Sequence, residues 1–146
     1  MKLSTRGRYG VRLMLDLALH EGEGPVLLRE IAKRQEVSEK YLWQLITPLK
    51  AAGLINSLRG AHGGYVLAKT PAEVNLRQIL SVLEGSLCLV DCVENPSACD
   101  RSSSCITRDV RVEASKGISK TLESMTLEKM VAGHLKKSES FTGYNI

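Results

Sequence analysis

The stretch LLREIAKRQEVSEKYLWQLITPLK, residues 27–50, carries two short helical patterns joined by a tight turn. The first pattern runs from about Leu27 to Arg34. Ser38 is a suitable N-cap for the second helix, because its hydroxyl can accept a hydrogen bond from a free backbone N–H. The side chains of the second helix that we expect to be buried are Tyr41, Leu42, Leu45, Ile46 and Leu49. Two helices in this arrangement, with another helix before them, are typical of a helix-turn-helix unit.

Two residues of this unit depart from the ideal pattern. Glu36 lies in the turn, where a glycine would be easier to accommodate if the backbone takes a positive φ. Pro48 has no N–H and would clash with the carbonyl of Gln44, so we expect the second helix to kink or loosen there.

Another helix is predicted before this unit, from Tyr9 to His20, and the glycines and proline at positions 22–25 end it. Its apolar stripe consists of Val11, Met14, Leu15, Ala18 and Leu19. Residues 1–8 contain no acidic residue and read as a basic arm of the kind that contacts the DNA backbone. The cations of this arm are Lys2, Arg6 and Arg8.

Residues 54–59 and 65–68 read as two β-strands joined by the glycine-rich segment 60–64. A β-hairpin directly after a helix-turn-helix makes a winged helix-turn-helix. Glycines let the hairpin tip approach a groove, and Arg59 beside them suits a narrow minor groove of A·T-rich DNA. The alternative is an ordinary hairpin with a solvated arginine.

The rest of the chain predicts three more helices. The first runs from about Asn75 to Glu84 and packs Leu76, Ile79, Leu80 and Leu83. A helix of about 20 residues follows, with a stripe formed by Ile106, Val110, Ala114, Ile118, Leu122 and Met125. This stripe needs a partner, either the same helix of a second subunit in a C2 dimer or the preceding domain. Residues 126–135 predict a short final helix, and residues 136–146 a mobile tail.

The outward face of the second helix of the helix-turn-helix supplies candidate DNA contacts. Gln44 can offer a bidentate amide to adenine, and Lys40 can reach guanine or phosphate. Trp43 is unusual on a solvated face, and it either contacts DNA or packs on the neighbouring helix or wing. The complete set of candidate DNA-binding residues is Lys2, Arg6, Arg8, Ser38, Lys40, Trp43, Gln44, Thr47, Lys50, Arg59, His62 and Gly63.

All four cysteines fall between Cys88 and Cys105, in a segment rich in turn-forming residues. The gaps between successive cysteines are three, six and five residues. Zinc sites usually pair cysteines about two to four residues apart, so this spacing fits zinc poorly. The charged N-terminus is not that of a signal peptide, which disfavours structural disulfides. Spacing alone favours iron–sulfur ligation and thiol redox chemistry equally, with zinc behind.

Composition narrows the class of protein. The chain has 146 residues and is 43% hydrophobic, enough for one or two small domains. Residues 1–70 contain 11 Lys and Arg against 6 Asp and Glu, whereas residues 71–146 contain 9 against 10. The positive half is therefore the one expected to meet DNA phosphates. A CxxC pair, a nucleophile–base set and a cofactor loop are missing, which argues against a thiol oxidoreductase or another enzyme. We expect a cytoplasmic location, where thiols stay reduced.

Four segments together point to a known family: KLSTRGRYGVRLMLDLA (residues 2–18), VSEKYLWQL (37–45), RGAHGGY (59–65) and the cysteine loop. With them the chain resembles, over residues 1–135, the IscR/NsrR family of bacterial transcription regulators. The similarity is closest to the IscR-type iron–sulfur cluster regulators. This resemblance implies a dimeric winged helix-turn-helix regulator of genes for cluster assembly or for iron, redox or nitric-oxide responses.

The implied fold is mostly α with a small β-hairpin, and its parts can be assigned along the chain. They are a winged helix-turn-helix domain (residues 1–85), a cysteine-rich cluster-binding loop (86–108), a dimerisation helix with a short C-terminal helix (105–135) and the tail (136–146). The expected partners are a second copy of the chain and a double-stranded DNA operator, with no membrane. The operator should be an imperfect palindrome whose half-sites are separated by whole turns of about 10 base pairs.

By the same resemblance, Cys92, Cys99 and Cys105 match the family's three cluster cysteines. The expected cofactor is an iron–sulfur cluster, of the 2Fe–2S type or else 4Fe–4S. Arg108 stands where IscR-type proteins supply a histidine, and Arg8 where NsrR-like proteins supply a carboxylate. Arginine stays protonated and is a poor metal ligand. The fourth ligand therefore stays open among Cys88, Asp91, Glu94, Asp100 and Asp109.

Cys88 follows an apolar run near a helix end, where a cysteine is often a small buried hydrophobe. We therefore expect three cysteine ligands and one oxygen ligand, with Cys88 structural. The alternative is a thiol-redox or zinc-containing regulator, or an interaction module, with the same fold and no iron–sulfur cluster.

Overall fold

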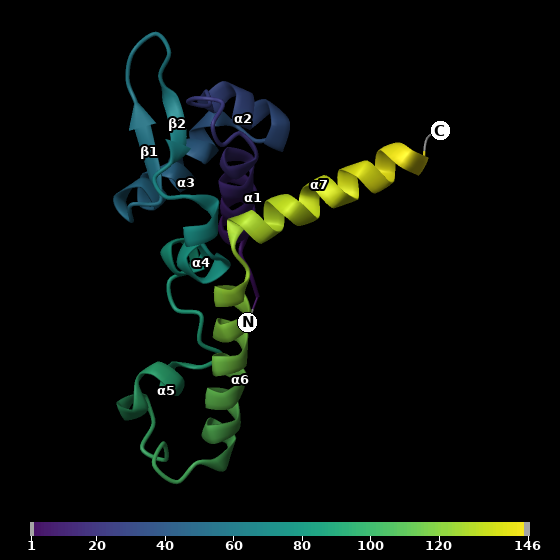
Figure 1. Ribbon diagram of the computed structural model, residues 1–146. Coiled ribbons are helices and arrows are strands. Elements are labelled where there is room, and N and C mark those ends of the chain that lie inside the picture. The colour runs from purple at the N-terminus through teal and green to yellow at the C-terminus, as the bar shows by residue number, and fades with distance from the viewer. Residues whose placement is uncertain (1, 145–146) are drawn as a thin grey trace.

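The computed structural model describes residues 2–144, and Figure 1 shows their arrangement. The chain is mostly helical with one antiparallel β-hairpin in this range, as the sequence predicts. The elements are α1 (Thr5–Leu19), α2 (Leu28–Gln35), α3 (Glu39–Ala51), β1 (Ile55–Leu58), β2 (Gly64–Leu67), η1 (Pro71–Glu73), α4 (Leu76–Glu84), α5 (Asp91–Glu94), η2 (Pro96–Ala98), α6 (Ile106–Ser124) and α7 (Leu127–Tyr144). None of the helices described in this range is long and apolar enough to cross a membrane.

The helix-turn-helix consists of α2 and α3. Ser38 caps α3, because its Oγ accepts a hydrogen bond from the N–H of Tyr41 at 3.1 Å. Glu36 ends α2 with φ 56° and ψ 44°, the left-handed conformation that favours glycine. The helix α3 continues through Pro48 to Ala51. The proline lies close to the end of the helix, and it does not break it.

The first helix begins at Thr5 and not at Tyr9, because Ser4 acts as its N-cap. The Ser4 Oγ accepts a hydrogen bond from the N–H of Gly7 at 3.2 Å. The predicted basic arm is therefore wrong for Arg6 and Arg8, which lie on the first turns of α1.

The start of α1 is also tied to the end of α4. Glu84 Oε1 accepts hydrogen bonds from the backbone N–H of Ser4 at 2.8 Å and from its hydroxyl at 2.7 Å. Beside this contact, a Cβ added at Gly10 would overlap the Leu83 side chain, and one added at Gly7 would overlap Glu84. The two glycines therefore let the backbone of α1 come close to α4.

The buried side of α1 differs from the predicted stripe. Leu13 and Leu17 are buried, whereas Leu15 and Leu19 are only half-buried. The helix packs against α2, α3, α4, β2 and α7, so it is covered from several sides and a single stripe does not describe it. The predicted cores of α3 and α4 are confirmed for Leu42, Leu45, Ile46 and Leu49 and for Ile79, Leu80 and Leu83. Tyr41 and Leu76, which were also predicted to be buried, are half-buried.

The hairpin forms the wing, in which Ile55 lies opposite Leu67. Val26, between α1 and α2, exchanges two backbone hydrogen bonds of 2.9 Å with Tyr65 of β2. The base of the wing is thus attached to the chain that leads into the helix-turn-helix.

A buried carboxylate joins α1 to α2. Asp16 is 3% exposed, and its oxygens accept hydrogen bonds from Arg34 at 2.7 and 2.9 Å and from Gln35 at 2.9 Å. Burial raises the pKa of Asp16, but these hydrogen bonds and the charge of Arg34 outweigh it and hold the pKa below its ordinary value. The ion pair therefore holds the helix-turn-helix in place on α1.

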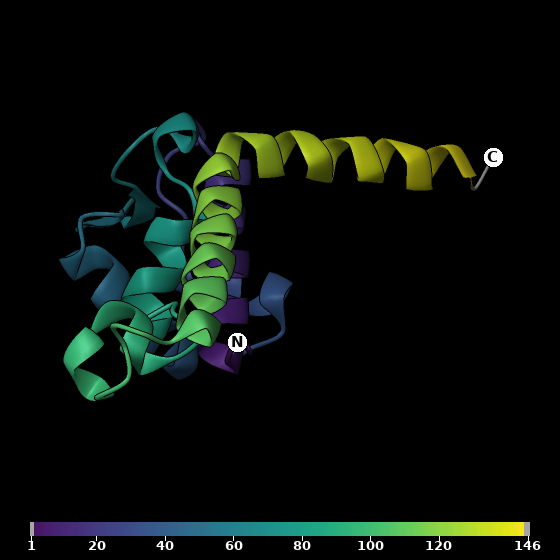
Figure 2. The same cartoon turned by 90° about the horizontal axis from the view of Figure 1, so that it is seen from below.

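The helices α6 and α7 leave the winged-helix domain in different directions, as Figures 1 and 2 show. The helix α6 packs on α4 and α5, whereas α7 starts against α1 and then projects away. The predicted short final helix is wrong in length, because α7 has 18 residues and includes most of the predicted tail. Residues 145–146 of that tail lie outside the described residues.

The apolar stripe of α6 is only partly covered by the rest of the chain. Ile106 is 73% exposed and Val110 is 65% exposed, whereas Ile118 and Leu122 are half-buried. Packing on the winged-helix domain therefore leaves the part of the stripe near the cysteine segment uncovered.

We expect Asp16→Asn to lower the free energy of unfolding by about 2–3 kcal/mol near neutral pH, because it removes the charge that Arg34 and Gln35 hydrogen-bond. The pKa of Asp16 lies below its ordinary value in the folded protein. Its stabilisation is therefore present above the unfolded pKa and is lost as the pH falls through the folded pKa. The variant should lose less stability than the wild type on acidification.

Urea unfolding at a single protein concentration, measured from neutral to acidic pH, tests this. Glu113→Gln is the control, because it removes an exposed ion pair of 3.3 Å with Lys116 and should change stability by less than about 0.5 kcal/mol. Equal effects of the two substitutions would contradict the assigned role of Asp16.

Candidate nucleic-acid interface and cysteine segment

The outer face of α3 presents exposed side chains beside the wing. Trp43 is 57% exposed, and Lys40 and Gln44 are exposed as well. Trp43, Lys50 and Tyr65 help to line a hollow of about 320 Å³ between α3 and β2. The indole ring therefore lies at the edge of this hollow and outside the core, where it is available to a partner.

Three of the predicted contacts on this face have partners within the protein. Besides the Ser38 cap, the Thr47 hydroxyl donates to the carbonyl oxygen of Trp43 at 2.8 Å, and Lys50 Nζ donates to Ser57 Oγ at 2.7 Å. Lys40 and Gln44 make no side-chain hydrogen bond or ion pair among the described residues. Their side chains are therefore free to meet DNA bases.

On the wing, Arg59 and His62 are exposed. A Cβ added at Gly63 would overlap the carbonyl oxygen of Leu58, and Gly60 has φ 106°. Both glycines are therefore needed to close the hairpin, which explains Gly63 without a DNA contact. Arg59 and His62 thus stay the exposed predicted contacts of the wing.

The cations near the N-terminus lie apart from the wing. Ser4 at the start of α1 contacts the end of α4, whereas His20 beyond its other end lines a pocket with Tyr65 of β2. The helix has 15 residues, about 22 Å at 1.5 Å per residue. The structure thus brings α3 and the wing together, but it does not bring Arg6 and Arg8 to the wing.

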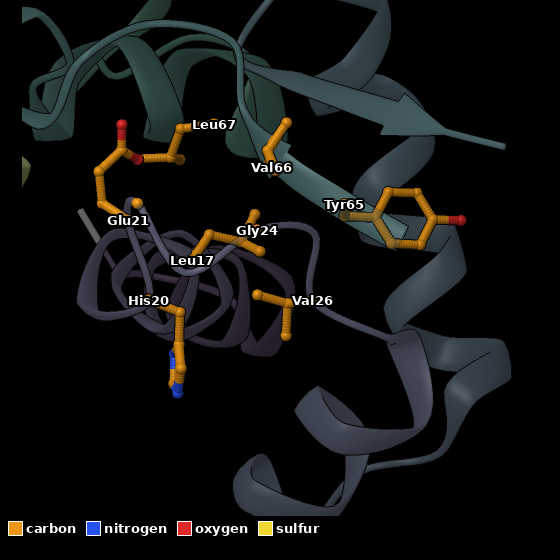
Figure 3. Close-up of a pocket in the computed structure, with 9 residues that line it drawn as sticks. Leu17, His20, Glu21, Gly24, Val26, Tyr65, Val66 and Leu67 are labelled. Carbon is orange, nitrogen blue, oxygen red and sulfur yellow. The ribbon is translucent and has the colours of Figure 1, made fainter. Parts of the chain in front are cut away.

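The pocket at the end of α1 has a volume of about 210 Å³, and Figure 3 shows its lining. Leu17, Val26 and Leu67 supply apolar side chains. His20 points away from them in this view, and its Nδ1 lies 2.8 Å from the backbone oxygen of Asp16. Ligand pockets usually exceed about 300 Å³. We therefore assign this hollow to imperfect packing between α1 and the wing.

The four cysteines lie in the segment between α4 and the start of α6. Cys92 in α5 is buried, Cys99 is exposed, and Cys88 and Cys105 are half-buried, all as free thiols. The expectation that Cys88 is the buried cysteine is wrong, because Cys92 in α5 is buried whereas Cys88 is only half-buried.

Arg108 has a structural role that sequence reasoning missed. Its Nε donates a hydrogen bond of 2.9 Å to the carbonyl oxygen of Cys92. The guanidinium thus holds α5 against the first turns of α6. The residue type at position 108 could have indicated this role, because an arginine cannot ligate a metal and its guanidinium needs another hydrogen-bond partner.

Cys88 and Cys105 differ in acidity. The pKa of the Cys88 thiol is raised, most of all by burial. A hydrogen bond with Glu94 and the negative charge of that carboxylate raise it further. The pKa of Cys105 is lowered, most of all by a hydrogen bond with Thr107, whose Oγ1 lies 3.0 Å from the sulfur. A second hydrogen bond, from the N–H of Arg108, lowers it further. Cys105 is also the N-cap residue of α6, where the helix dipole favours a thiolate.

The donor types of this segment fit an iron–sulfur cluster, but the donors are not assembled. Within residues 2–144, no group of three or more His, Cys, Asp or Glu side chains converges closely enough to hold a metal ion. Cys92, Cys99 and Cys105 nevertheless share one segment of mostly exposed turns, and thiolates are the usual ligands of such clusters. To hold a cluster, the segment would have to close around it.

Comparison with known proteins bears on this architecture. Residues 3–133 match the Rrf2 family, described as "Iron-dependent Transcriptional regulator". The protein Rrf2 of Nitratidesulfovibrio vulgaris is 42% identical over 131 residues, which are 90% of this chain and 87% of that protein. The structure of CymR, the global cysteine regulator of B. subtilis, has a TM-score of 0.77 at 39% identity and covers 90% of this chain and 97% of its own. T. potens IscR has a TM-score of 0.75 at 44% identity, covering 92% and 88%.

The fold and the exposed surface of α3 and the wing define a winged helix-turn-helix transcription regulator and not an enzyme. More particularly, the chain belongs to the Rrf2 family. The resemblance inferred from its motifs is confirmed, since both IscR and CymR are among its structural neighbours.

We expect Cys105 to react several-fold faster than Cys88 with iodoacetamide near neutral pH, because only the thiolate attacks and the two pKa values are shifted in opposite directions. Reduced, metal-free protein would be labelled briefly and read by peptide mass spectrometry, with urea-unfolded protein as the reference. Thr107→Val should slow Cys105 without changing Cys88. Faster labelling of Cys88 in the folded wild type would contradict the assignment.

Proposed function

We propose that the protein is a homodimeric repressor-type regulator that binds operator DNA through α3 and the wing and senses iron–sulfur or redox status through its cysteine segment. The observation that carries this proposal is the distance between two exposed surfaces, the outer face of α3 with the wing and the cysteine segment. Figure 1 shows the wing and the cysteine segment at opposite ends of the molecule, linked by α4 and α6. Such a regulator acts on the chromosome, so we place it in the cytoplasm.

For DNA recognition, Gln44 and Lys40 are the side chains of α3 that the protein itself does not use, and Arg59 is the exposed cation of the wing. An amide in the major groove and an arginine in the minor groove would both read base identity. Arg6 and Arg8 lie on α1 and would add affinity through phosphates, without reading sequence.

The proposed dimer is supported by the uncovered apolar stripe of α6. Ile106 and Val110 are large apolar side chains with most of their surface exposed, and burying them against the same stripe of a second copy would remove that surface from water. Two winged-helix domains related by a two-fold axis would then meet two half-sites of a palindromic operator.

For the sensor, Cys92, Cys99 and Cys105 would hold an iron–sulfur cluster, which supplies redox-active and oxygen-sensitive iron when it is bound. The fourth ligand would be an oxygen from a nearby carboxylate (Asp91, Glu94, Asp100 or Asp109), because Arg108 stays protonated and is a poor metal ligand. A second candidate function is a cluster-free thiol switch. The unassembled free thiols and the likeness to the cysteine regulator CymR favour it.

We expect Arg59→Ala to weaken binding to the cognate operator by about 1–3 kcal/mol and to leave random DNA largely unaffected. Gln44→Ala should behave in the same way. Arg6→Ala should weaken both DNAs alike and reduce the salt dependence, because phosphate contacts carry no sequence information. Titrations by fluorescence anisotropy, with an operator selected by the wild type, measure all three effects.

The control for this series is Lys137→Ala, because Lys137 is exposed on the distal part of α7, away from α3 and the wing. If Arg59→Ala weakened operator and random DNA equally, the wing would be only a backbone contact.

We expect protein purified without oxygen, or reconstituted with iron and sulfide, to show a visible iron–sulfur spectrum. Cys92→Ala, Cys99→Ala and Cys105→Ala should abolish it, whereas Cys88→Ala should keep it. Iron and sulfide analysis and circular dichroism of each variant separate loss of the cluster from loss of the fold.

A folded but colourless Cys88→Ala variant would show that the site uses all four cysteines. Colourless wild-type protein with stoichiometric zinc would exclude the cluster sensor. Colourless, metal-free protein with oxidant-dependent DNA binding would instead support the thiol switch.

A further inference from the structure

A hollow of about 420 Å³ lies where α4, the cysteine segment and α6 meet, and its lining includes Cys88 and Val93 but none of the three predicted cluster cysteines. The helices α4 and α5 both pack on α6, and the hollow is lined by residues of all three, including Arg77 of α4 and Val93 of α5. Its volume falls in the range of about 300–1,000 Å³ that is usual for small-molecule sites. A molecule bound there would touch all three elements that link the two ends of the protein.

The rim of the hollow is positively charged. Arg77 of α4 and Lys116 and Lys120 of α6 line it, against the single carboxylate of Glu123. Arg77 is paired with Glu123 across the joint between α4 and α6. Lys116 is paired with Glu113 at 3.3 Å, whereas Lys120 forms no ion pair with the described residues. Since exposed ion pairs contribute little, these cations remain available to an anion.

The floor of the hollow has an unmet hydrogen-bonding requirement. Ser115 lines it and is only 8% exposed, and its Oγ is buried without a hydrogen-bond partner in the part of the chain that the structure describes. A buried hydroxyl without a partner costs about 1–3 kcal/mol. Because this Oγ has almost no accessible surface, a ligand oxygen would remove this cost only after the Ser115 side chain rotates toward the hollow.

The remaining wall of the hollow is apolar, because Val93 of α5 and Val112 of α6 line it together with the half-buried Cys88. An inorganic anion would leave this wall without a contact. A small organic dianion with a short hydrocarbon chain would match both the cations and the valines.

Dimerisation through α6 would leave this hollow open. Lys116 and Lys120 each follow an apolar-stripe residue by two positions, Ala114 and Ile118. Two positions correspond to about 200° around a helix. The lysines therefore lie on nearly the opposite flank of α6 from the stripe that a second copy would cover.

From these observations we propose that the hollow is an effector site for a small organic dianion such as a dicarboxylate, bound non-covalently by Arg77, Lys116, Lys120 and Ser115. The ligand would compete with Glu123 for Arg77 and would thereby change the joint between the winged-helix domain and α6. Binding of the dianion requires neither DNA nor a cluster. An experiment can therefore disprove the effector site without disproving the proposed sensor.

The test uses full-length, cluster-free protein labelled with ¹⁵N and titrated with glutarate, with sulfate at matched ionic strength as the inorganic anion. We expect saturable shifts of amide signals around Arg77, Cys88 and residues 112–123, and weaker binding of sulfate. Lys120→Ala should weaken glutarate binding by about tenfold, as loss of one charge-assisted contact does. Lys137→Ala is the control and should bind as the wild type does.

Ser115→Ala separates a binding role from a structural one. It should weaken glutarate binding several-fold while leaving the thermal stability unchanged or higher, because it removes a buried hydroxyl without a partner. The proposal is overturned if glutarate gives no saturable shifts, if Lys137→Ala weakens binding as much as Lys120→Ala, or if sulfate binds as tightly as glutarate.

Discussion

The close contact between α1 and α4 sets the relative positions of the two ends of the molecule. Gly7 and Gly10 remove the Cβ atoms that would otherwise overlap Glu84 and Leu83. The Glu84 carboxylate then accepts two hydrogen bonds from Ser4, whose hydroxyl in turn caps α1. Because α4 also packs on α3 and α6, this contact is the point at which the helix-turn-helix is connected to the C-terminal half. A larger residue at either glycine would therefore disturb both halves together.

The wing end of the protein is held together by more interactions than the cysteine end. At the wing end, the Asp16–Arg34 ion pair, the strand pairing of Val26 with Tyr65 and the Lys50–Ser57 hydrogen bond attach α2, α3 and β1 to one another and to α1. At the cysteine end, α5 packs on α6 and is attached to it by the hydrogen bond from Arg108 to the Cys92 carbonyl, while residues 95–101 are exposed. A firmly held winged-helix end coupled to a more exposed cysteine segment is the arrangement that the proposed sensor requires, because local order at one end can bias the other.

The candidate sites were predictable from the sequence to different degrees. Local features of the sequence include the residue types at Gln44 and Arg59 and the grouping of the cysteines. The structure and its relatives confirm the winged-helix pattern and the family. The effector hollow was not predictable, because its cations come from α4 and α6 and its hydroxyl from Ser115, residues that have no common pattern in the sequence. Likewise, the high burial of Cys92 relative to Cys88 depends on how α5 docks on α6, and the apolar run before Cys88 gave no information on this.

The sequence by itself determined the elements whose signals lie within one or two turns of chain. Ser38 marked the start of α3, Asn75 and Gln78 cap α4 with a reciprocal pair of hydrogen bonds, and the glycines after β1 marked the hairpin. Only the tertiary structure decided the burial of α1, because that helix is surrounded by several elements that are distant in sequence. It also decided that Arg6 and Arg8 lie far from the wing and that Arg108 serves as a structural clamp. The physical reason is that caps and turns satisfy backbone groups locally, whereas burial and ion pairing depend on which distant segments meet.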